Sequence, residues 1–447
     1  MRQPGTIRCA LLVVLTGLLA AILASPRPGS LSSRCAASSL GSGSRGQLAY
    51  IGADGNVYVV GASLQTRRAI TTDATAPAEG SGRSYHRLAW SPDNQLAFAA
   101  VIRSGNQATG QLYVASSPGA SPRAVAEDPD HFIIYIHWSP APCPDRPACS
   151  QLAYLVQGSD GVDLHLVTLE GSTSGDRLLG TGRPFYFSWA PGRPETEALM
   201  AWHTGPAGPS VTHPRLALYD LGHDQVLDLA LLPGSFLAPA WSPQGDHWLA
   251  VTTEDGENRL RLFEGDRPAQ VLLAAEHDIA FSWSPDGEYV AYATREFSDD
   301  PFYGPVYLVD MTTGQPRQLT SDAFRVRGFF WAPGPDVGSP HRQRLAYLTW
   351  LDLPDGEWGQ WRVIDVPSRQ DRGFAAFNLS PLMRFAIHSF GQYAQSHRFW
   401  APDGRYLVYA DRDRTGVDRL WLVDTWAEQD REPIFVAEGS LAYWSWR

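Results

Sequence analysis

The chain has 447 residues, a formal net charge of −11, 44% hydrophobic residues and 19% charged residues. This composition excludes a disordered chain, and the acidic balance argues against a nucleic-acid partner, because phosphate backbones attract basic surfaces. The 16 tryptophans, 41 glycines and 34 prolines indicate many short strands joined by tight turns.

Residues 1–24 have the pattern of an export signal. Two arginines precede the apolar stretch Cys9–Ala24, which is short for a bilayer span of about 20 residues. We expect a cleaved signal peptide; an uncleaved signal anchor and lipid attachment at Cys35 are the alternatives. Residues 25–46 are rich in Ser, Gly and Pro and predict a flexible tether. The protein is therefore expected outside the cytoplasm (periplasmic, secreted or on the outer face of the cell membrane), where the N-terminal segment could attach it to the membrane.

A tryptophan followed by Ser or Ala and then by Pro recurs along the rest of the chain. The best copies continue as Ser-Pro-Asp-Gly, which matches a type I turn because Pro fixes the second position and Gly suits the last. Such a turn between alternating apolar segments predicts a hairpin whose first strand ends at the tryptophan. The seven copies lie at Trp90, Trp138, Trp189, Trp241, Trp283, Trp331 and Trp400.

Apolar segments of the Leu-Ala-Tyr type predict the second strand of each unit. Polar hairpins, often Asp-Gly, connect them to apolar third strands, and weaker fourth strands follow. No helical 3.6-residue periodicity competes over a useful length. The pattern predicts eight four-stranded blades, with seven as the fallback if the unit at 189–232 is an irregular insertion. The second strands begin at Leu48, Leu96, Leu152, Ala198, Leu249, Val290, Leu345 and Leu407.

The two ends of the repeat array are complementary. The unit that begins at Leu48 lacks a preceding tryptophan strand, whereas the chain ends in LAYWSWR, a tryptophan strand with nothing after it. Pairing residues 441–446 with the strand at Leu48 would close a ring and remove exposed strand edges. We therefore predict a single closed, all-β propeller over residues 47–447, its first blade completed by the C-terminal strand. A pair of β-sandwiches, the alternative, would not repeat at this interval.

The repeat WSPDG–(L/V)A(F/Y)–(L/V)Y(L/V)VD resembles the TolB-type propeller repeats, which are related to WD40-type repeats. The resemblance covers residues 47–447 and implies a fold rather than a function. The same repeat builds the propeller domain of prolyl oligopeptidase-like peptidases, whose hydrolase domain needs a Gly-x-Ser-x-Gly elbow. The nearest string here, Gly171–Gly175, has Thr at its centre. We therefore expect a protein that is not an enzyme.

Two groups of side chains are candidates for a metal site. His86, His137 and His397 are expected near the propeller axis, where lyases that resemble this repeat family hold a metal. A metal-dependent lyase or hydrolase is therefore the alternative function, although structural histidines without any cofactor are the expected case. Asp411 and Asp413 imitate the start of a calcium-binding loop, but the twelfth position lacks the required Glu, which favours an ordinary hairpin.

Cys143 and Cys149 bracket a short Pro-containing loop and form no Cys-x-x-Cys motif. A thiolate zinc site is therefore not expected. Outside the cytoplasm, the two cysteines are expected to form a disulfide; two free cysteines are the alternative.

The long aromatic segments are expected on one face of the propeller. In an up-and-down blade, the hairpins between second and third strands share a face with the links between blades. Clustered aromatic and Arg side chains are typical of interfaces, although single aromatics could simply pack between blades. The predicted function is a recognition or scaffold propeller that binds a protein, a peptide or a cell-wall glycan. The predicted binding residues are Tyr303, Arg325, Arg327, Trp350, Trp358, Trp361, Tyr393 and His397.

Overall fold

The computed structural model describes residues 46–75, 81–129, 131–143, 149–158, 161–192, 199–207, 213–235, 237–334, 343–353, 356–427 and 432–447. The predicted signal segment and all but the last residue of the predicted tether lie outside these ranges. Within them, no helix is both long and apolar enough to cross a membrane.

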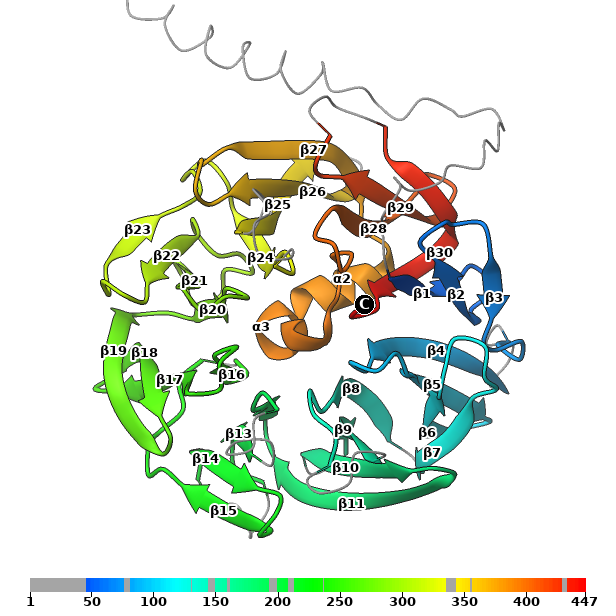
Figure 1. Cartoon of the computed structure of the whole chain (residues 1–447), viewed down its shortest axis with the longest axis horizontal. Coiled ribbons are helices and arrows are strands. Elements are labelled where there is room, and N and C mark those ends of the chain that lie inside the picture. Colours follow the sequence, from blue (N-terminus) through cyan, green and yellow to red (C-terminus); the bar gives the residue numbers. More distant parts are fainter. Residues whose placement is uncertain are drawn as a thin grey trace, which may run out of the picture.

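The strands form a ring of antiparallel sheets around a central axis, which is the architecture of a β-propeller (Figure 1). Six sheets have four strands each. They are β4 (Ser81–Trp90), β5 (Leu96–Ser104), β6 (Gln107–Ala115) and β7 (Arg123–Asp128); β8 (Phe132–Trp138), β9 (Cys149–Gln157), β10 (Val162–Glu170) and β11 (Thr173–Gly182); β12 (Phe185–Trp189), β13 (Leu199–Thr204), β14 (Arg215–Asp220) and β15 (Gln225–Asp228); β16 (Ala240–Trp241), β17 (His247–Glu254), β18 (Glu257–Glu264) and β19 (Arg267–Ala275); β20 (Ile279–Trp283), β21 (Tyr289–Thr294), β22 (Tyr307–Asp310) and β23 (Pro316–Gln318); and β24 (Val326–Trp331), β25 (Arg344–Leu353), β26 (Gly356–Asp365) and β27 (Asp371–Asn378).

The two ends of the array form one further sheet, which has six strands in the order β28-β29-β30-β1-β2-β3. Its long strand β30 pairs with β29 through its first half and with β1 through its second half. The strands are β28 (Tyr406–Arg412), β29 (Asp418–Asp424), β30 (Ile434–Trp444), β1 (Gln47–Gly52), β2 (Val57–Gly61) and β3 (Arg67–Ala69).

Counted as continuous hydrogen-bonded sheets, the propeller has seven blades. The prediction of eight four-stranded blades is therefore wrong, because β30 joins the first and last repeat units into one sheet. The fallback number of seven is correct because the first and last repeat units form one sheet, and not because a repeat unit is an irregular insertion. The unit at 189–232 is no irregular insertion, since it forms the regular four-stranded sheet β12–β15.

The predicted pairing of the C-terminal segment with the strand at Leu48 is confirmed. Leu48 lies opposite Trp444, and the register continues to Ile51 opposite Leu441. Just past the strand, the Ser445 N–H donates to the Gln47 carbonyl at 2.8 Å. The chain therefore closes the ring by joining its two ends in one sheet.

The Trp-Ser-Pro repeat at Trp283 forms both a turn and a contact between blades. In the turn, the Gly287 N–H donates to the Ser284 carbonyl at 2.9 Å, and Gly287 has a φ of +75°, which favours glycine. At the end of the strand, the Trp283 indole N–H donates to the Ala240 carbonyl of the preceding blade at 3.1 Å. The repeat thus connects successive inner strands.

Stacked aromatic pairs connect the second and third strands of several blades. The members of each pair are cross-strand neighbours, as the alternation of side chains in a strand allows. The pairs, with their centroid separations, are Tyr50–Tyr58 (5.3 Å), Phe98–Tyr113 (5.5 Å), Trp248–Phe263 (4.1 Å) and Tyr292–Tyr307 (5.3 Å).

A helical segment occupies the propeller axis (Figure 1). It comprises α2 (Pro381–His388), α3 (Phe390–Tyr393) and the 3₁₀ turn η1 (Ala394–Ser396), and we call it the axial plug. The plug stands where a full inner strand would otherwise lie beside β28. In the described part of the chain, that edge of β28 pairs only through the isolated bridges Leu379–Asp411 and Trp400–Leu407.

The sequence carries a local signal for this helix. The Ser380 hydroxyl accepts a hydrogen bond from the Met383 N–H at 3.2 Å, and Pro381 follows the cap. A serine cap followed by proline favours a helix start. The expectation that no helix competes with the strand pattern is therefore wrong for this segment.

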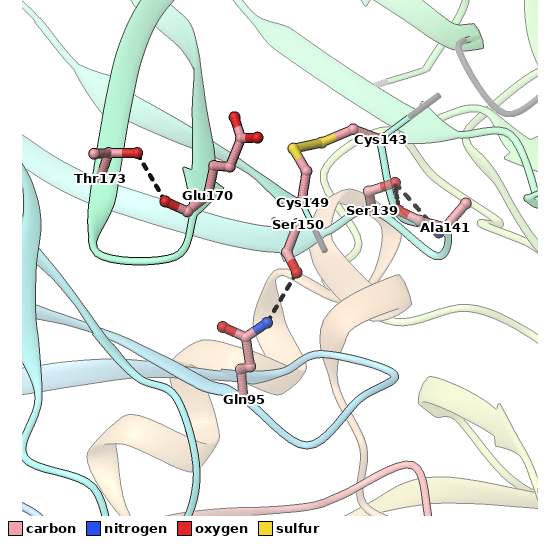
Figure 2. Close-up of a disulfide and its surroundings, with 8 residues drawn as sticks. All are labelled: Gln95, Ser139, Ala141, Cys143, Cys149, Ser150, Glu170 and Thr173. Carbon is pink, nitrogen blue, oxygen red and sulfur yellow. Dashed lines mark hydrogen bonds between the residues drawn. A yellow bond between two sulfur atoms is a disulfide. The ribbon is translucent and has the colours of Figure 1, made fainter. Parts of the chain in front are cut away.

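The structure joins Cys143 and Cys149 in a disulfide whose Cα atoms are 5.3 Å apart (Figure 2). The Cys143 N–H also donates to the Cys149 carbonyl at 3.1 Å. Beside it, the Gln95 amide of the preceding blade donates to the Ser150 hydroxyl at 2.9 Å. The disulfide therefore lies next to a contact between two blades.

Candidate functional site

Aromatic and arginine side chains from three consecutive segments meet on one face of the propeller. The segments are the β21–β22 connection, the start of β24 and the end of β25. Phe302 is their centre: the guanidinium carbons of Arg325 and Arg327 lie 4.3 and 5.5 Å from its ring centroid, within cation–π distance. The Trp350 ring lies 5.8 Å from the same centroid.

An acidic partner fixes one of these arginines. The Arg325 guanidinium donates to the Asp300 carboxylate at 2.6 Å, while the Arg325 side chain remains 54% exposed. The ion pair holds the guanidinium over Phe302 and leaves its other edge open to solvent. The group is therefore ordered before any partner arrives, which lowers the entropy cost of binding.

Helix α2 extends this surface toward the axis. His388 lies 6.2 Å from Trp350, and Phe385 precedes His388 by three positions, which places both on one side of the helix. The Arg87 guanidinium lies 4.4 Å from the Phe385 centroid, yet the Phe385 side chain remains 44% exposed. We call Phe302, Arg325, Arg327, Trp350, Phe385 and His388 the loop-face cluster.

The structure divides the predicted binding residues. Arg325, Arg327 and Trp350 belong to the loop-face cluster and are at least partly accessible. Tyr303 and Trp361 are buried, with 7% and 1% of their surface exposed. Tyr303 pairs through its backbone with Val326, and Trp361 packs against Phe330 and Phe399.

The other three predicted residues lie in strands or on the axis. Trp358 is the third residue of β26, opposite Leu351, and its indole N–H is shielded without a partner among the described residues. Tyr393 is buried and stacks on Tyr135 at 4.5 Å. His397 stacks on Tyr443 at 5.3 Å.

Sequence reasoning missed Phe302, Phe385 and His388. The pair on α2 could have been found from Ser380 and Pro381, which mark a helix start and so set the side on which Phe385 and His388 lie. Phe302 lies in one of the segments that the sequence places on this face. Nothing in the sequence indicates that Phe302, and not the neighbouring Tyr303, contacts the two arginines.

The axial histidines are close to one another and neutral. Burial lowers the pKa of His86 to about 4, with a smaller contribution from the Arg87 guanidinium. Burial alone lowers the pKa of His137 to about 4. Burial, and then the charges of Arg87 and His137, lower the pKa of His397 to about 3. Arg87 is thus a fixed cation near His86 and His397.

This arrangement does not resemble a metal centre. Among the described residues, no group of three His, Cys, Asp or Glu side chains converges as metal ligands would. One ring nitrogen of His86 already hydrogen-bonds the Ile133 carbonyl at 2.9 Å. Asp413, at the predicted calcium-like loop, accepts hydrogen bonds from the backbone N–H groups of Thr415 and Val417, as in an ordinary hairpin turn.

Solved structures of other propellers share this architecture. The dihydro-heme d1 dehydrogenase NirN in complex with DHE is 14% identical over 92% of this chain and 77% of its own, with a TM-score of 0.51. TolB from Acinetobacter baumannii is 15% identical over 79% of this chain and 82% of its own, with a TM-score of 0.37. Sqt1 from Chaetomium thermophilum, bound to the N-terminus of the ribosomal protein L10, is 16% identical over 83% of this chain and 91% of its own, with a TM-score of 0.42.

The chain has the fold of a β-propeller. No protein-family model and no curated protein sequence matches it. At these identities the likeness concerns the fold alone, so function has to be argued from the side chains of this propeller.

Proposed function

We propose that this protein is an exported recognition propeller that binds a protein or peptide through the loop-face cluster. The observation that carries the proposal is Phe302 beneath two guanidinium groups, flanked by Trp350 and continued by the exposed Phe385. Aromatic and Arg side chains supply most of the energy at protein interfaces. This cluster, ordered before binding, suits a peptide segment of the partner that places an apolar side chain against the rings and hydrogen-bond acceptors against the guanidinium groups.

Exposure of large rings supports the same surface. Phe297, in the β21–β22 connection, is 57% exposed and Phe385 is 44% exposed. Exposed apolar groups that lie near one another mark binding surfaces more often than scattered single ones do. Phe297 belongs to the same β21–β22 connection as Phe302, the centre of the loop-face cluster.

The export part of the proposal rests on the apolar stretch Cys9–Ala24 and on the Cys143–Cys149 disulfide, since disulfides persist in oxidising compartments. N-terminal sequencing of protein recovered from outside the cytoplasm should give a mature end near residue 25. Thiol labelling without reduction should leave Cys143 and Cys149 unmodified. Protein found only in the cytoplasm, with both thiols reactive, would contradict export.

The binding part can be tested with peptides selected from a displayed random library against the full-length protein. Titration of the selected peptides should show that Phe385→Ser and Phe302→Ala each weaken binding by at least about 1 kcal/mol. Arg325→Gln should weaken it as well, because it removes a guanidinium that is held in place by Asp300.

A matched control is available on the rim. Phe435, in β30, is 45% exposed, so Phe435→Ser changes as much exposed ring surface as Phe385→Ser does. We expect the Phe435 variant to bind like the wild type. Selected peptides that are insensitive to every loop-face variant, or selection of glycans and no peptides, would overturn the proposal.

A further inference from the structure

A cavity lies beside the α3–η1 part of the axial plug. Its volume is about 200 Å³, it is partly open to solvent, and its lining residues include members of α3, η1 and the inner strands β16, β20 and β24. Phenylalanine and tryptophan rings form a large part of its lining, which also includes Pro333 of a repeat turn. Its wall residues include Phe281, Phe329, Phe330, Phe390, Ser282, Gln392, His397 and Arg398.

Arg398 brings an unpaired cation to this cavity. Protein surrounds its guanidinium on nearly every side, although the residue is still partly accessible. Its Nε has no hydrogen-bond partner among the described residues, and no charged group there is close enough to shift its pKa. The guanidinium carbon lies 3.8 Å from the Trp446 ring centroid, so the cation is stacked on an indole but not neutralised.

Such a charge is costly to bury, because buried ions are normally paired and hydrogen-bonded. Burial lowers the pKa of Arg398 to about 10, so the group is still protonated at neutral pH. Burial also holds the neighbouring His397 neutral, with its pKa lowered to about 3. The cavity therefore combines one fixed positive charge with aromatic walls.

We propose that this cavity binds a small aromatic carboxylate, whose carboxylate pairs with Arg398 and whose ring lies among the phenylalanine side chains. A dry cavity of about 150 Å³ holds one benzene molecule. A cavity of about 200 Å³ therefore has room for one aromatic ring and a carboxylate. Ser282 and Gln392 provide further polar groups in the same wall. The cavity shares no wall residue with the loop-face cluster, and its proposed ligand does not depend on the proposed function.

The probes are 4-fluorobenzoate and its neutral analogue 4-fluorobenzamide, observed by fluorine NMR with the full-length protein. We expect the wild type to bind the carboxylate at least about tenfold more tightly than the amide, since a charge-assisted hydrogen bond is lost with the amide. Arg398→Gln should abolish this preference. Arg398→Lys should retain part of it, because lysine keeps the charge but not the planar fork.

Arg267 provides the control, because its side chain is 89% exposed on the rim strand β19. Arg267→Gln should bind both probes like the wild type. Equal binding of the two probes by the wild type, or no binding at millimolar concentration, would overturn the proposal. So would unchanged selectivity of a folded Arg398→Gln variant. If that variant fails to fold, the wild-type comparison and Arg398→Lys still decide.

Discussion

The Trp138 indole N–H donates to the backbone carbonyl of Ala89, in the preceding blade, at 3.0 Å. The repeat tryptophans form a series of such bonds around the axis, each reaching the residue just before the tryptophan of the preceding inner strand. The other bonds run from Trp90 to Tyr443, Trp189 to His137, Trp283 to Ala240, Trp331 to Ser282 and Trp400 to Phe330. This geometry requires an indole, which explains why tryptophan recurs where another aromatic residue would satisfy packing alone.

Replacing Trp138 by Phe should therefore cost more than the same change at Trp241. Both tryptophans are buried, but the Trp241 indole N–H has no partner among the described residues. The two substitutions remove the same atoms, so their difference isolates the hydrogen bond. We expect Trp138→Phe to lower the free energy of unfolding by about 1 kcal/mol more than Trp241→Phe does. Equal losses in urea titrations would show that the inter-blade bond contributes nothing.

The sequence predicted the strands and turns of the propeller because each repeat carries local signals for them. The alternation around Leu48 and the incomplete last unit were enough to predict ring closure. The number of separate sheets was not predictable in this way. It depends on whether β30 passes from one unit to the next without a break in pairing, and that is a property of the closed ring rather than of any repeat.

The closing strand should be indispensable for cooperative folding. Removing residues 441–447 would delete the segment that pairs with β1 and leave the buried edge of β1 at Leu48 without hydrogen-bond partners. We expect this variant to lose the cooperative thermal transition. Removing only residues 446 and 447 should merely lower the melting temperature, because it deletes the bond from the Trp446 indole to the Trp90 carbonyl and leaves β30 intact. A cooperative melt of the longer deletion at the wild-type temperature would contradict the closure argument.

The axial histidines should make the protein less stable in mild acid. His137 has a folded pKa of about 4 against an ordinary value of 6.5, because burial disfavours its charged form. Between these values the unfolded chain binds a proton that the folded chain excludes, so stability falls as the pH drops from about 6.5 toward 4. Above pH 7 the group is neutral in both states and makes no pH-dependent contribution.

His137→Phe should reduce this acid sensitivity. The ring would keep its aromatic neighbours Tyr135 and Phe187 and lose its titration. We expect the slope of unfolding free energy against pH to decrease by about 1 kcal/mol per pH unit between pH 6 and 4.5. Above pH 7, variant and wild type should differ only by a constant. Parallel curves over the whole range would mean that His137 binds a proton in the folded protein as readily as in the unfolded chain.

Less of the candidate site than of the fold was predictable. Arg325, Arg327 and Trp350 lie at ends of strands whose register follows from the repeat, and they do gather on one face. The axial plug was not foreseen, because an eight-residue helix is shorter than the window of 11–18 residues in which helical periodicity shows. The plug draws Tyr393 and His397 onto the axis, where they cannot belong to the open face.

The packing of the axial plug against β24 can be tested by a substitution at Gly328. The residue is buried in β24, and a Cβ there would lie 2.9 Å from Cγ and 3.2 Å from Cβ of Phe390 in α3. Phe390 has little room to move, because its ring packs against Phe329 at 4.8 Å and Phe330 at 5.2 Å. Gly328→Ala should therefore lower the free energy of unfolding by about 1–3 kcal/mol through overpacking.

Gly175 gives the matched control for this substitution. It lies in the rim strand β11, and a Cβ there would meet no atom within 4 Å, so Gly175→Ala should leave stability within about 0.5 kcal/mol of the wild type. Because α3 also forms a wall of the axial cavity, displacement of Phe390 should weaken 4-fluorobenzoate binding in the Gly328 variant and leave it unchanged in the Gly175 variant. If Gly328→Ala is as stable as the wild type and binds the probe equally well, α3 is not packed against β24 as the geometry requires, and the axial plug is not a fixed part of the propeller.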